Sequence, residues 1–390
     1  MKKIFIKKSS AAKLASYFPW VYDNEILEVS SGSLKPGEIV EVFTKKGTFL
    51  GIGYFNPQSV ISLRILSFQK TEINKSFFIE KIRKAFESRR EVLKVTNACR
   101  AVYSEADGLP GLIADIYDRI LVLQINTAGM ENLKGLIIDA FRETFDLKGI
   151  YEKSDARSRE KEGLHTAEQP VSGEVPESLN IQENGISFLV EIKGSQKTGF
   201  YLDQRRNRSI VSERIKGDMQ VLDIFCNTGG FGIYAACKGA RVQSVDVSQS
   251  ALDIALENAR LNGVQMQTVK SDAFDFLDES VNKGLRADAI ILDPPPFSKS
   301  RGSRQAAIGG LKHLVLQSLR ILNEGGLLAI FSCSHHISVS DLLALSMEAA
   351  QDTRSRLEVT DFLFQDLDHP YIINIPQTLY LKGLLFRKRD

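Results

Sequence analysis

Short stretches of alternating apolar and polar residues dominate the first part of the chain. They cover 38–43, 48–55 and 60–66, with turn signals at Lys46-Gly47 and Asn56-Pro57 between them. Alternation with a period of two, bounded by turn residues, is typical of β-strands. We therefore predict a small all-β barrel over residues 1–70.

A central α+β domain is predicted for residues 71–180. Apolar positions at helical spacing favour a helix over 75–95. Further elements are expected as strands at 99–103, 111–117, 120–125 and 150–151 and a helix near 131–144. The polar stretch 155–180 contains Pro170, Gly173 and Pro176, so we expect a linker there.

From about residue 186 the pattern changes to strands that alternate with helices. The apolar strands are 221–225, 241–246, 289–293 and 327–331, the helices lie near 230–238, 248–262, 305–322 and 340–352, and late strands follow at 357–364 and 378–386. This alternation predicts an α/β domain over 181–390 with a doubly wound, mostly parallel sheet. Its ligand should lie at the carboxyl ends of the strands.

Length and composition agree with several domains. The chain has 390 residues, more than the ~250–300 that one hydrophobic core usually serves. Its 43% hydrophobic and 25% charged residues are typical of a soluble globular protein. No apolar run approaches the ~20 residues of a membrane-spanning helix, and no signal peptide is recognisable. We expect a cytoplasmic protein.

The formal net charge of +2 conceals an asymmetry. Residues 1–100 carry 18 Lys+Arg and 9 Asp+Glu, which gives +9 there and −7 over the rest of the chain. A basic front end favours contact with a polyanion such as nucleic acid, although solvated helix surfaces produce the same imbalance.

The four cysteines are Cys99, Cys226, Cys237 and Cys333, with no CxxC pair and no common zinc spacing. We therefore expect free thiols and no metal site.

A glycine-rich segment follows the first strand of the last domain. From Asp223 to Gly232 it reads Asp-Ile-Phe-Cys-Asn-Thr-Gly-Gly-Phe-Gly; glycines let a ligand approach the backbone, and the helix start offers free N–H groups. Asp246 ends the next strand, where a carboxylate can accept hydrogen bonds from ribose hydroxyls. Asp272 is placed to meet an adenine amino group. The spacing is not GxGxxG, which disfavours an NAD site; a tight structural turn is the other alternative.

Two further strand ends carry candidate chemistry. The turn Asp293-Pro294-Pro295-Pro296-Phe297 would hold a carboxylate rigidly against a planar base. Methyltransferases that act on nucleic acid with S-adenosylmethionine need such a clamp, whereas dehydrogenases do not. Cys333 ends the next strand, and a cysteine there is a natural nucleophile toward a pyrimidine ring. The alternatives are a structural proline turn and an inert core thiol. Cys226 is expected to line the cofactor loop.

These motifs resemble the bacterial large-subunit ribosomal RNA cytosine-C5 methyltransferases that carry an N-terminal PUA domain, over nearly the whole chain. The segments that carry the resemblance are 51–57, 64–67, 154–164, 197–205, 368–370 and 379–383, together with the motifs at Asp293 and Cys333. The resemblance implies a PUA barrel followed by a Rossmann-like class I methyltransferase domain. S-adenosyl-L-methionine would be the cofactor and large-subunit ribosomal RNA the partner. A homodimer is left open.

The resemblance also implies roles for individual residues. Cys333 and Asp293 are the expected catalytic residues, and Lys45, Lys46 and Arg64 the expected RNA contacts. The expected cofactor contacts are Lys197, Thr198, Phe200, Asp203, Gln204, Arg205, Asp223, Phe225, Asn227, Thr228, Gly229, Gly230, Phe231, Asp246, Val247, Ser248, Asp272, Ala273 and Asp293. Pro296 departs from the family, which usually has Lys after the two prolines.

The implied reaction is methylation of cytosine C5 through a covalent bond between Cys333 and C6. One alternative is an RNA methyltransferase acting on an exocyclic amine of adenine or guanine, which needs no thiol. Another is a non-catalytic RNA-binding assembly factor. Locally, the segment 203–205 also fits an ordinary helix start capped by Asp203.

Overall fold

The computed structural model describes residues 1–390 except 31, 194–198, 298–303 and 390. Its internal contacts divide the chain into two compact units. The first unit comprises Met1–Ile181, Val190–Leu202 and Leu367–Thr378, and the second comprises Gln182–Leu189, Asp203–Asp366 and Leu379–Asp390. The two-stranded sheet of β12 (Ser178–Glu183) and β13 (Ile186–Glu191) falls where the chain passes between them. The three-domain division at residues 70 and 180 stays a prediction.

The first unit begins with a six-stranded sheet in the order β2-β6-β5-β4-β1-β3. Its strands are β1 (Lys2–Ile6), β2 (Trp20–Val21), β3 (Ile26–Val29), β4 (Glu38–Thr44), β5 (Phe49–Phe55) and β6 (Leu63–Ser67), with helix α1 (Lys8–Ala15) after β1. All neighbouring strands are antiparallel except β1 and β4. Alternate side chains, among them Ile4, Val40 and Ile65, form one apolar cluster with Leu14 of α1. The strands expected from the alternating pattern are therefore confirmed.

A second sheet in the same unit has the order β11-β10-β9-β8-β7. Its strands are β7 (Ala98–Tyr103), β8 (Leu112–Tyr117), β9 (Ile120–Ile125), β10 (Gly149–Lys153) and β11 (Glu168–Gly173), and its helices are α2 (Lys75–Glu87), α3 (Ala128–Asn132), α4 (Lys134–Thr144) and α5 (Ala156–Lys161). The apolar faces of α2 and α4 pack on this sheet, with Phe78 and Phe141 fully buried.

Two local expectations in this region were wrong. Helix α2 ends at Glu87, where the chain turns before a short 3-10 segment, so the helical pattern to residue 95 overshoots. The expected linker over 155–180 contains α5 and strand β11, which pairs with β10. Strand β11 lies at the sheet edge and is mostly exposed, so its sequence lacks the apolar alternation that would have revealed it.

The second unit is built on a seven-stranded sheet in the order β16-β15-β14-β17-β18-β20-β19. The strands are β14 (Gln220–Ile224), β15 (Arg241–Asp246), β16 (Gln267–Lys270), β17 (Ala287–Leu292), β18 (Leu322–Ser332), β19 (Arg356–Phe364) and β20 (Lys382–Arg389). The first five are parallel, and β20 pairs antiparallel with both β18 and β19.

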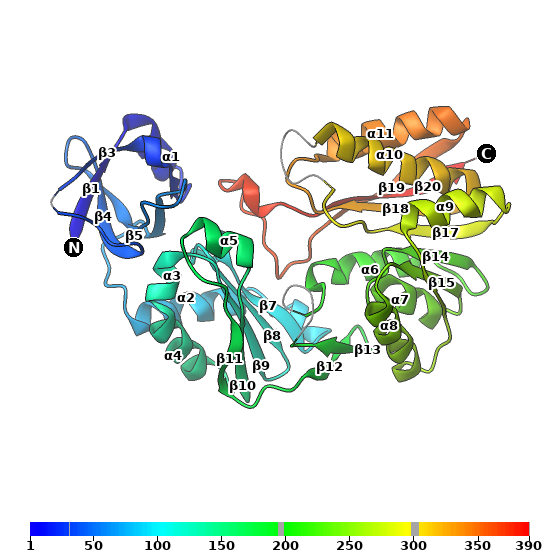
Figure 1. The fold of residues 1–390 in the computed structure, drawn as a ribbon, viewed down its shortest axis with the longest axis horizontal. Coiled ribbons are helices and arrows are strands. Elements are labelled where there is room, and N and C mark those ends of the chain that lie inside the picture. Colours follow the sequence, from blue (N-terminus) through cyan, green and yellow to red (C-terminus); the bar gives the residue numbers. More distant parts are fainter. Residues whose placement is uncertain (31, 194–198, 298–303, 390) are drawn as a thin grey trace. The chain divides into compact units, whose positions relative to one another are not determined.

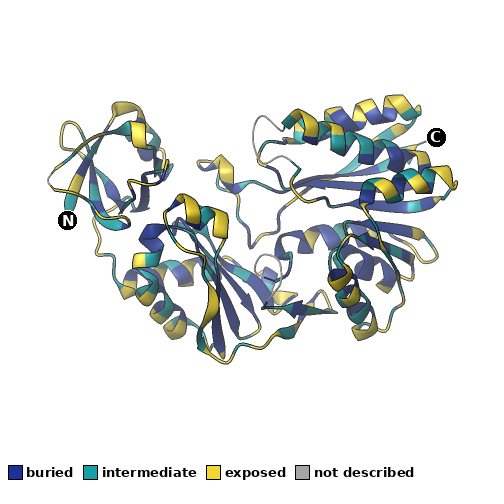
Figure 2. Cartoon of the chain, viewed as in Figure 1, coloured by how far each residue is buried: buried dark blue, intermediate teal, exposed yellow. Residues whose placement is uncertain are grey.

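Helices cover both faces of this sheet (Figure 1). They are α6 (Arg205–Glu213), α7 (Gly230–Cys237), α8 (Gln249–Leu261), α9 (Ala273–Asn282), α10 (Arg304–Ile321) and α11 (Val339–Thr353). Helices α9, α10 and α11 pack on one face and α6 and α7 on the other. The inner strands β14, β17, β18 and β20 are mostly buried (Figure 2), whereas the edge strands β16 and β19 are largely intermediate or exposed. The doubly wound architecture predicted from the strand–helix alternation is confirmed.

The strand order reverses between β14 and β17. The strands that follow β14 are added on one side as β15 and β16, and β17 starts the other side, which continues with β18. Ligands of such sheets bind at this reversal, outside the carboxyl ends of the strands. Among the described residues no helix is long and apolar enough to span a membrane.

Candidate active site

The loop between β14 and α7 is tightly folded at the carboxyl edge of the sheet. Phe225, Asn227 and Gly229 have positive φ angles of 63°, 48° and 81°. A Cβ at Gly229 would lie 3.0 Å from that of Ala255, and one at Gly232 would lie 2.7 Å from the Ser244 hydroxyl. Glycine is therefore required at 229 by conformation and at 232 by space, and the loop is compact enough for a ligand to approach its backbone.

The buried side chain of Asp223 holds this loop in place. Its side chain is 1% exposed, and Oδ2 accepts a hydrogen bond from the Gly232 N–H at 2.8 Å. Burial raises the pKa of Asp223 to about 7, and the nearby charges of Asp293 and Asp246 act in the same direction. Asp223 therefore holds the loop to the start of α7; a direct cofactor contact stays a prediction.

Asp246 lies at the end of β15 and faces the same loop. Its carboxylate accepts hydrogen bonds from the N–H groups of Asn227 at 2.9 Å and Ser248 at 3.0 Å. Asp246 is half-buried and the following Val247 is 61% exposed. Each carboxylate oxygen has a second lone pair, so Asp246 can still accept hydrogen bonds from ribose hydroxyls. The loop and this carboxylate together fit a nucleoside cofactor.

Asp272 begins the next helix along the sheet edge. It is the N-cap of α9, and its Oδ1 accepts hydrogen bonds from Phe274 N–H at 2.8 Å and Asp275 N–H at 3.4 Å. Ala273 beside it is buried. Capping accounts for Asp272 locally, and its predicted contact with adenine stays a prediction.

The proline turn after β17 brings Asp293 to the centre of this edge. The Asp293 N–H donates to the Ile224 carbonyl of β14 at 3.4 Å. Its Oδ2 accepts a hydrogen bond from Gln204 Nε2 at 3.0 Å. The Phe297 ring lies 6.3 Å from that of Phe225 and 5.9 Å from that of Phe274. The turn is thus anchored on one side by the loop between β14 and α7 and on the other side by α9.

Cys333 follows β18, the strand next to β17. The parallel register pairs Leu292 with Ile330, so Asp293 and Cys333 leave the same edge of the sheet on adjacent strands. Cys333 is half-buried. Cys226, in the loop between β14 and α7, is 7% exposed. Burial raises its pKa well above the usual value, and Asp223 and Asp246 add to the effect. Of these two thiols, Cys333 has the environment that suits a nucleophile.

Sequence reasoning gave no role to Lys382, the first residue of β20. It is 5% exposed, and its Nζ donates a hydrogen bond to the Ser334 carbonyl at 2.7 Å. Burial lowers the pKa of Lys382 to about 8, while Cys333 acts in the opposite direction. A lysine in the otherwise apolar run 381–386 is the signal that could have identified it.

The segment before α6 has a mainly internal role. Asp203 accepts a hydrogen bond from the Tyr380 hydroxyl at 2.5 Å, and Arg205 pairs with Asp366 at 2.8 Å and with Glu183 at 3.5 Å. Gln204, not Asp203, is the N-cap of α6, and its side chain forms no capping hydrogen bond. The buried guanidinium of Arg205 therefore pairs with two carboxylates, and its expected cofactor contact stays a prediction.

Three expected cofactor contacts lie outside the second unit or outside the described residues. Phe200 belongs to the first unit, where its N–H donates to the Tyr117 hydroxyl at 3.2 Å. Lys197 and Thr198 lie outside the described residues. The remaining expected contacts, Thr228, Gly230 and Phe231, lie in the loop or the first turn of α7.

The expected RNA contacts divide into two kinds. Lys45 and Lys46 are exposed at the turn between β4 and β5. Arg64 is 8% exposed and pairs with the buried Glu162 at 2.8 Å. Arg64 is thus engaged inside the unit, and its expected RNA contact stays a prediction.

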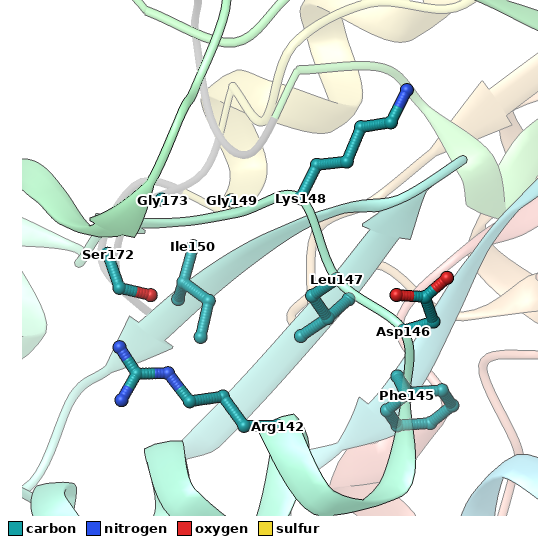
Figure 3. Close-up of a pocket in the computed structure, with 9 residues that line it drawn as sticks. All are labelled: Arg142, Phe145, Asp146, Leu147, Lys148, Gly149, Ile150, Ser172 and Gly173. Carbon is teal, nitrogen blue, oxygen red and sulfur yellow. The ribbon is translucent and has the colours of Figure 1, made fainter.

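A hollow of about 370 Å³ lies elsewhere, in the first unit between α4 and β10 (Figure 3). Arg142, Lys148 and Ser172 line it, and it contains none of the expected site residues. Within the described parts of the chain, no group of three or more His, Cys, Asp or Glu side chains could hold a metal ion.

Known proteins resemble the chain over almost its whole length. Ribosomal RNA large subunit methyltransferase I of Aeromonas hydrophila is 39% identical, with 99% of each chain covered, and its namesake in Photobacterium profundum is 37% identical, with 97% of this chain and 98% of that one covered. A SAM-dependent methyltransferase of Streptococcus mutans superposes with a TM-score of 0.84 at 24% identity, covering 99% of this chain and 100% of that one. A methyltransferase complexed with SAH gives 0.86 at 23% identity, with the same coverage.

Two domain families match separate parts of the chain. A PUA-like domain matches residues 4–68, and an S-adenosylmethionine-dependent methyltransferase matches residues 157–387. The expected fold class, a PUA barrel and a Rossmann-like methyltransferase domain, is thereby confirmed, as is S-adenosylmethionine as the cofactor. The chain belongs to the S-adenosylmethionine-dependent methyltransferases, in the family of the ribosomal RNA large subunit methyltransferase I proteins.

Proposed function

We propose that this protein methylates C5 of a cytosine in large-subunit ribosomal RNA, through a temporary covalent bond between Cys333 and C6 of the ring. The names of the relatives support ribosomal RNA as the substrate. The observation that carries the chemistry is the half-buried thiol of Cys333, which leaves the sheet edge on the strand next to Asp293.

The two expected catalytic residues have complementary tasks. Cytosine C5 is a poor nucleophile, and addition of the Cys333 thiolate to C6 moves electron density onto it. Asp293 would hydrogen-bond the N3 and N4 edge of the base and stabilise the ring in its protonated form. The bound cofactor supplies an electrophilic methyl group. Loss of the C5 proton to a base then lets the Cys333 sulfur leave, which restores the thiolate and the aromatic ring.

The first unit would supply the RNA contact. Lys45 and Lys46 project from an exposed turn of the PUA-like domain, where lysines can neutralise phosphates. The target cytosine must leave its stack to reach the sheet edge, which favours a single-stranded or loop site.

Replacement of the nucleophile gives the direct test. Cys333→Ala should lower methyl transfer to protein-free ribosomal RNA by at least about a thousandfold, while the S-adenosylmethionine affinity measured by calorimetry stays within about twofold of wild type. Cys237→Ser, at an exposed position at the end of α7, is the matched control and should remain active.

Nucleoside mass spectrometry of the product separates the alternatives. 5-Methylcytidine that depends on Cys333 supports the proposal. Normal methylation by Cys333→Ala would refute the covalent route. A methylated exocyclic amine would favour the other methyltransferase class, which the Asp293-Pro294-Pro295 turn also suits.

A further inference from the structure

Lys382 is a buried lysine whose side chain runs past Cys333. The antiparallel register places Lys382 opposite Ser332, and its Nζ bonds the carbonyl of Ser334 at 2.7 Å. The side chain therefore spans the end of β18 from residue 332 to residue 334. Cys333 is the residue between these two points.

A buried ammonium group needs a negative partner to offset its lost hydration. Among the described residues no carboxylate forms an ion pair with Lys382, and the group that favours its charged form is Cys333. His335 lies on the same loop, with its ring 6.4 Å from that of Tyr380. The thiolate of Cys333 is thus the negative charge that this environment offers to Lys382.

We propose that Lys382 is a positioning residue that takes the proton of the Cys333 thiol and holds the sulfur as a thiolate before the substrate base enters. The S–H bond breaks, an N–H bond forms on the amine, and an ammonium–thiolate pair results. The sulfur electron pair then forms the bond to C6, and its later departure regenerates the same pair. The catalytic purpose of this step rests on the function proposed above, whereas the pairing itself does not.

The protonation behaviour of the neighbouring groups agrees with this role. Burial lowers the pKa of Lys382 to about 8, so roughly a tenth of the Lys382 side chains are neutral amines at pH 7 and can accept the thiol proton. The pKa of His335 is lowered by shielding from water, and the charges of Lys382 and His336 add to this. A neutral His335 leaves Lys382 as the cation next to the thiol.

The test measures the reactivity of Cys333 without requiring methyl transfer. Full-length wild type, Lys382→Met and Lys382→Arg are treated with iodoacetamide from pH 5.5 to 9.5, and alkylation of the Cys333 peptide is followed by mass spectrometry. We expect Lys382→Met to slow alkylation at pH 7 by about tenfold and to move its pH midpoint upward by about one unit. Lys382→Arg should keep most of the wild-type profile, because the alkylation midpoint reports the positive charge beside the thiolate, which arginine retains although it cannot accept a proton.

Lys388→Met is the matched control. Lys388 lies on the same strand and bonds the carbonyls of Leu319 and Leu322 at 3.3 and 2.9 Å, so its loss should leave the Cys333 profile unchanged. An unchanged midpoint in folded Lys382→Met, verified by circular dichroism, would overturn the proposal, as would an equal shift in Lys388→Met. If Cys333→Ala still methylates RNA while Lys382→Met shifts the alkylation midpoint, the proposed function fails and the pairing stands.

Discussion

The two halves of one sheet edge in the second unit differ in the charge they carry. The half formed by β14, β15 and β17 ends in three carboxylates, Asp223, Asp246 and Asp293, which are close enough for two of them to raise the pKa of the third. At the half formed by β18 and β20, Cys333 follows β18 and the buried Lys382 begins β20. Acceptors on one side suit ribose hydroxyls, and a cation on the other suits a thiolate.

The cysteines show what this difference does to one residue type. Cys226 and Cys333 both follow strands of the same sheet. Cys226 is buried beside Asp223 and Asp246, which favour its neutral form, whereas Cys333 is half-buried and acts electrostatically on Lys382. The two thiols therefore share a position after a strand but differ in their neighbouring charges and in their exposure.

The largest expected effect concerns Asp223. Its pKa is about 7 in the folded protein, against 3.8 for an ordinary Asp, so between pH 4 and 7 the folded state retains a proton that the unfolded state releases. The stability of wild type should therefore fall as the pH rises through this window. Asp223→Asn, which does not titrate, should gain stability over wild type by roughly 4 kcal/mol at most between these limits.

Urea unfolding measured at several pH values would check this, with alkylation of the buried Cys226 as the local signal. Asp253→Asn, at an exposed position of α8, is the control and should keep the wild-type pH dependence. If the stabilities of wild type and Asp223→Asn changed equally with pH, Asp223 would not retain a proton in the folded protein.

The second effect separates the two thiols directly. In the native full-length protein at pH 7.5 we expect iodoacetamide to alkylate Cys226 about a hundredfold more slowly than Cys333, because burial and nearby carboxylates keep the Cys226 thiol neutral. Peptide mass spectrometry reads both rates in one sample. Denaturation in urea should remove the difference between the two alkylation rates. Equal rates in the native protein would show that the environments of Cys226 and Cys333 do not differ in this way.

The smallest effect concerns Asp246. Replacing it with Asn removes the negative charge and leaves one acceptor oxygen in place of two. We therefore expect S-adenosylmethionine to bind about tenfold more weakly, close to the loss of one charge-assisted hydrogen bond of ~1.4 kcal/mol. Isothermal titration calorimetry measures this, with Asp253→Asn again as the control. Wild-type affinity in Asp246→Asn would remove this carboxylate from the cofactor site.

Much of the fold was predictable because periodicity reports burial. The parallel strands of the second unit are continuous apolar runs between helices, which the sequence shows directly. Asp223, Asp246, Asp293 and Cys333 stand at or near the carboxyl ends of these runs, so the sequence also indicated the sheet edge where the site was expected. The edge strand β11 escaped prediction because it is mostly exposed and carries no such pattern.

Two of the expected site residues have surroundings that the sequence does not reveal. Arg64 and Arg205 look like surface cations in the sequence, but both are buried against carboxylates far away in the chain, Glu162 for Arg64 and Asp366 for Arg205. A sequence shows the charge of a side chain but not the partner that neutralises it.

The sequence by itself determined the α/β architecture, the order of strands and helices, and the residue types at the strand ends, because these depend on local periodicity and on turns. Only the tertiary structure decided which charges meet. The tertiary structure buries Cys226 among carboxylates. Lys382 lies 49 positions after Cys333 in the sequence, and the antiparallel pairing of β18 and β20 brings its side chain past Cys333. The charge environment of a thiol is set by such distant neighbours, because electrostatic interactions depend on distance in space and on burial.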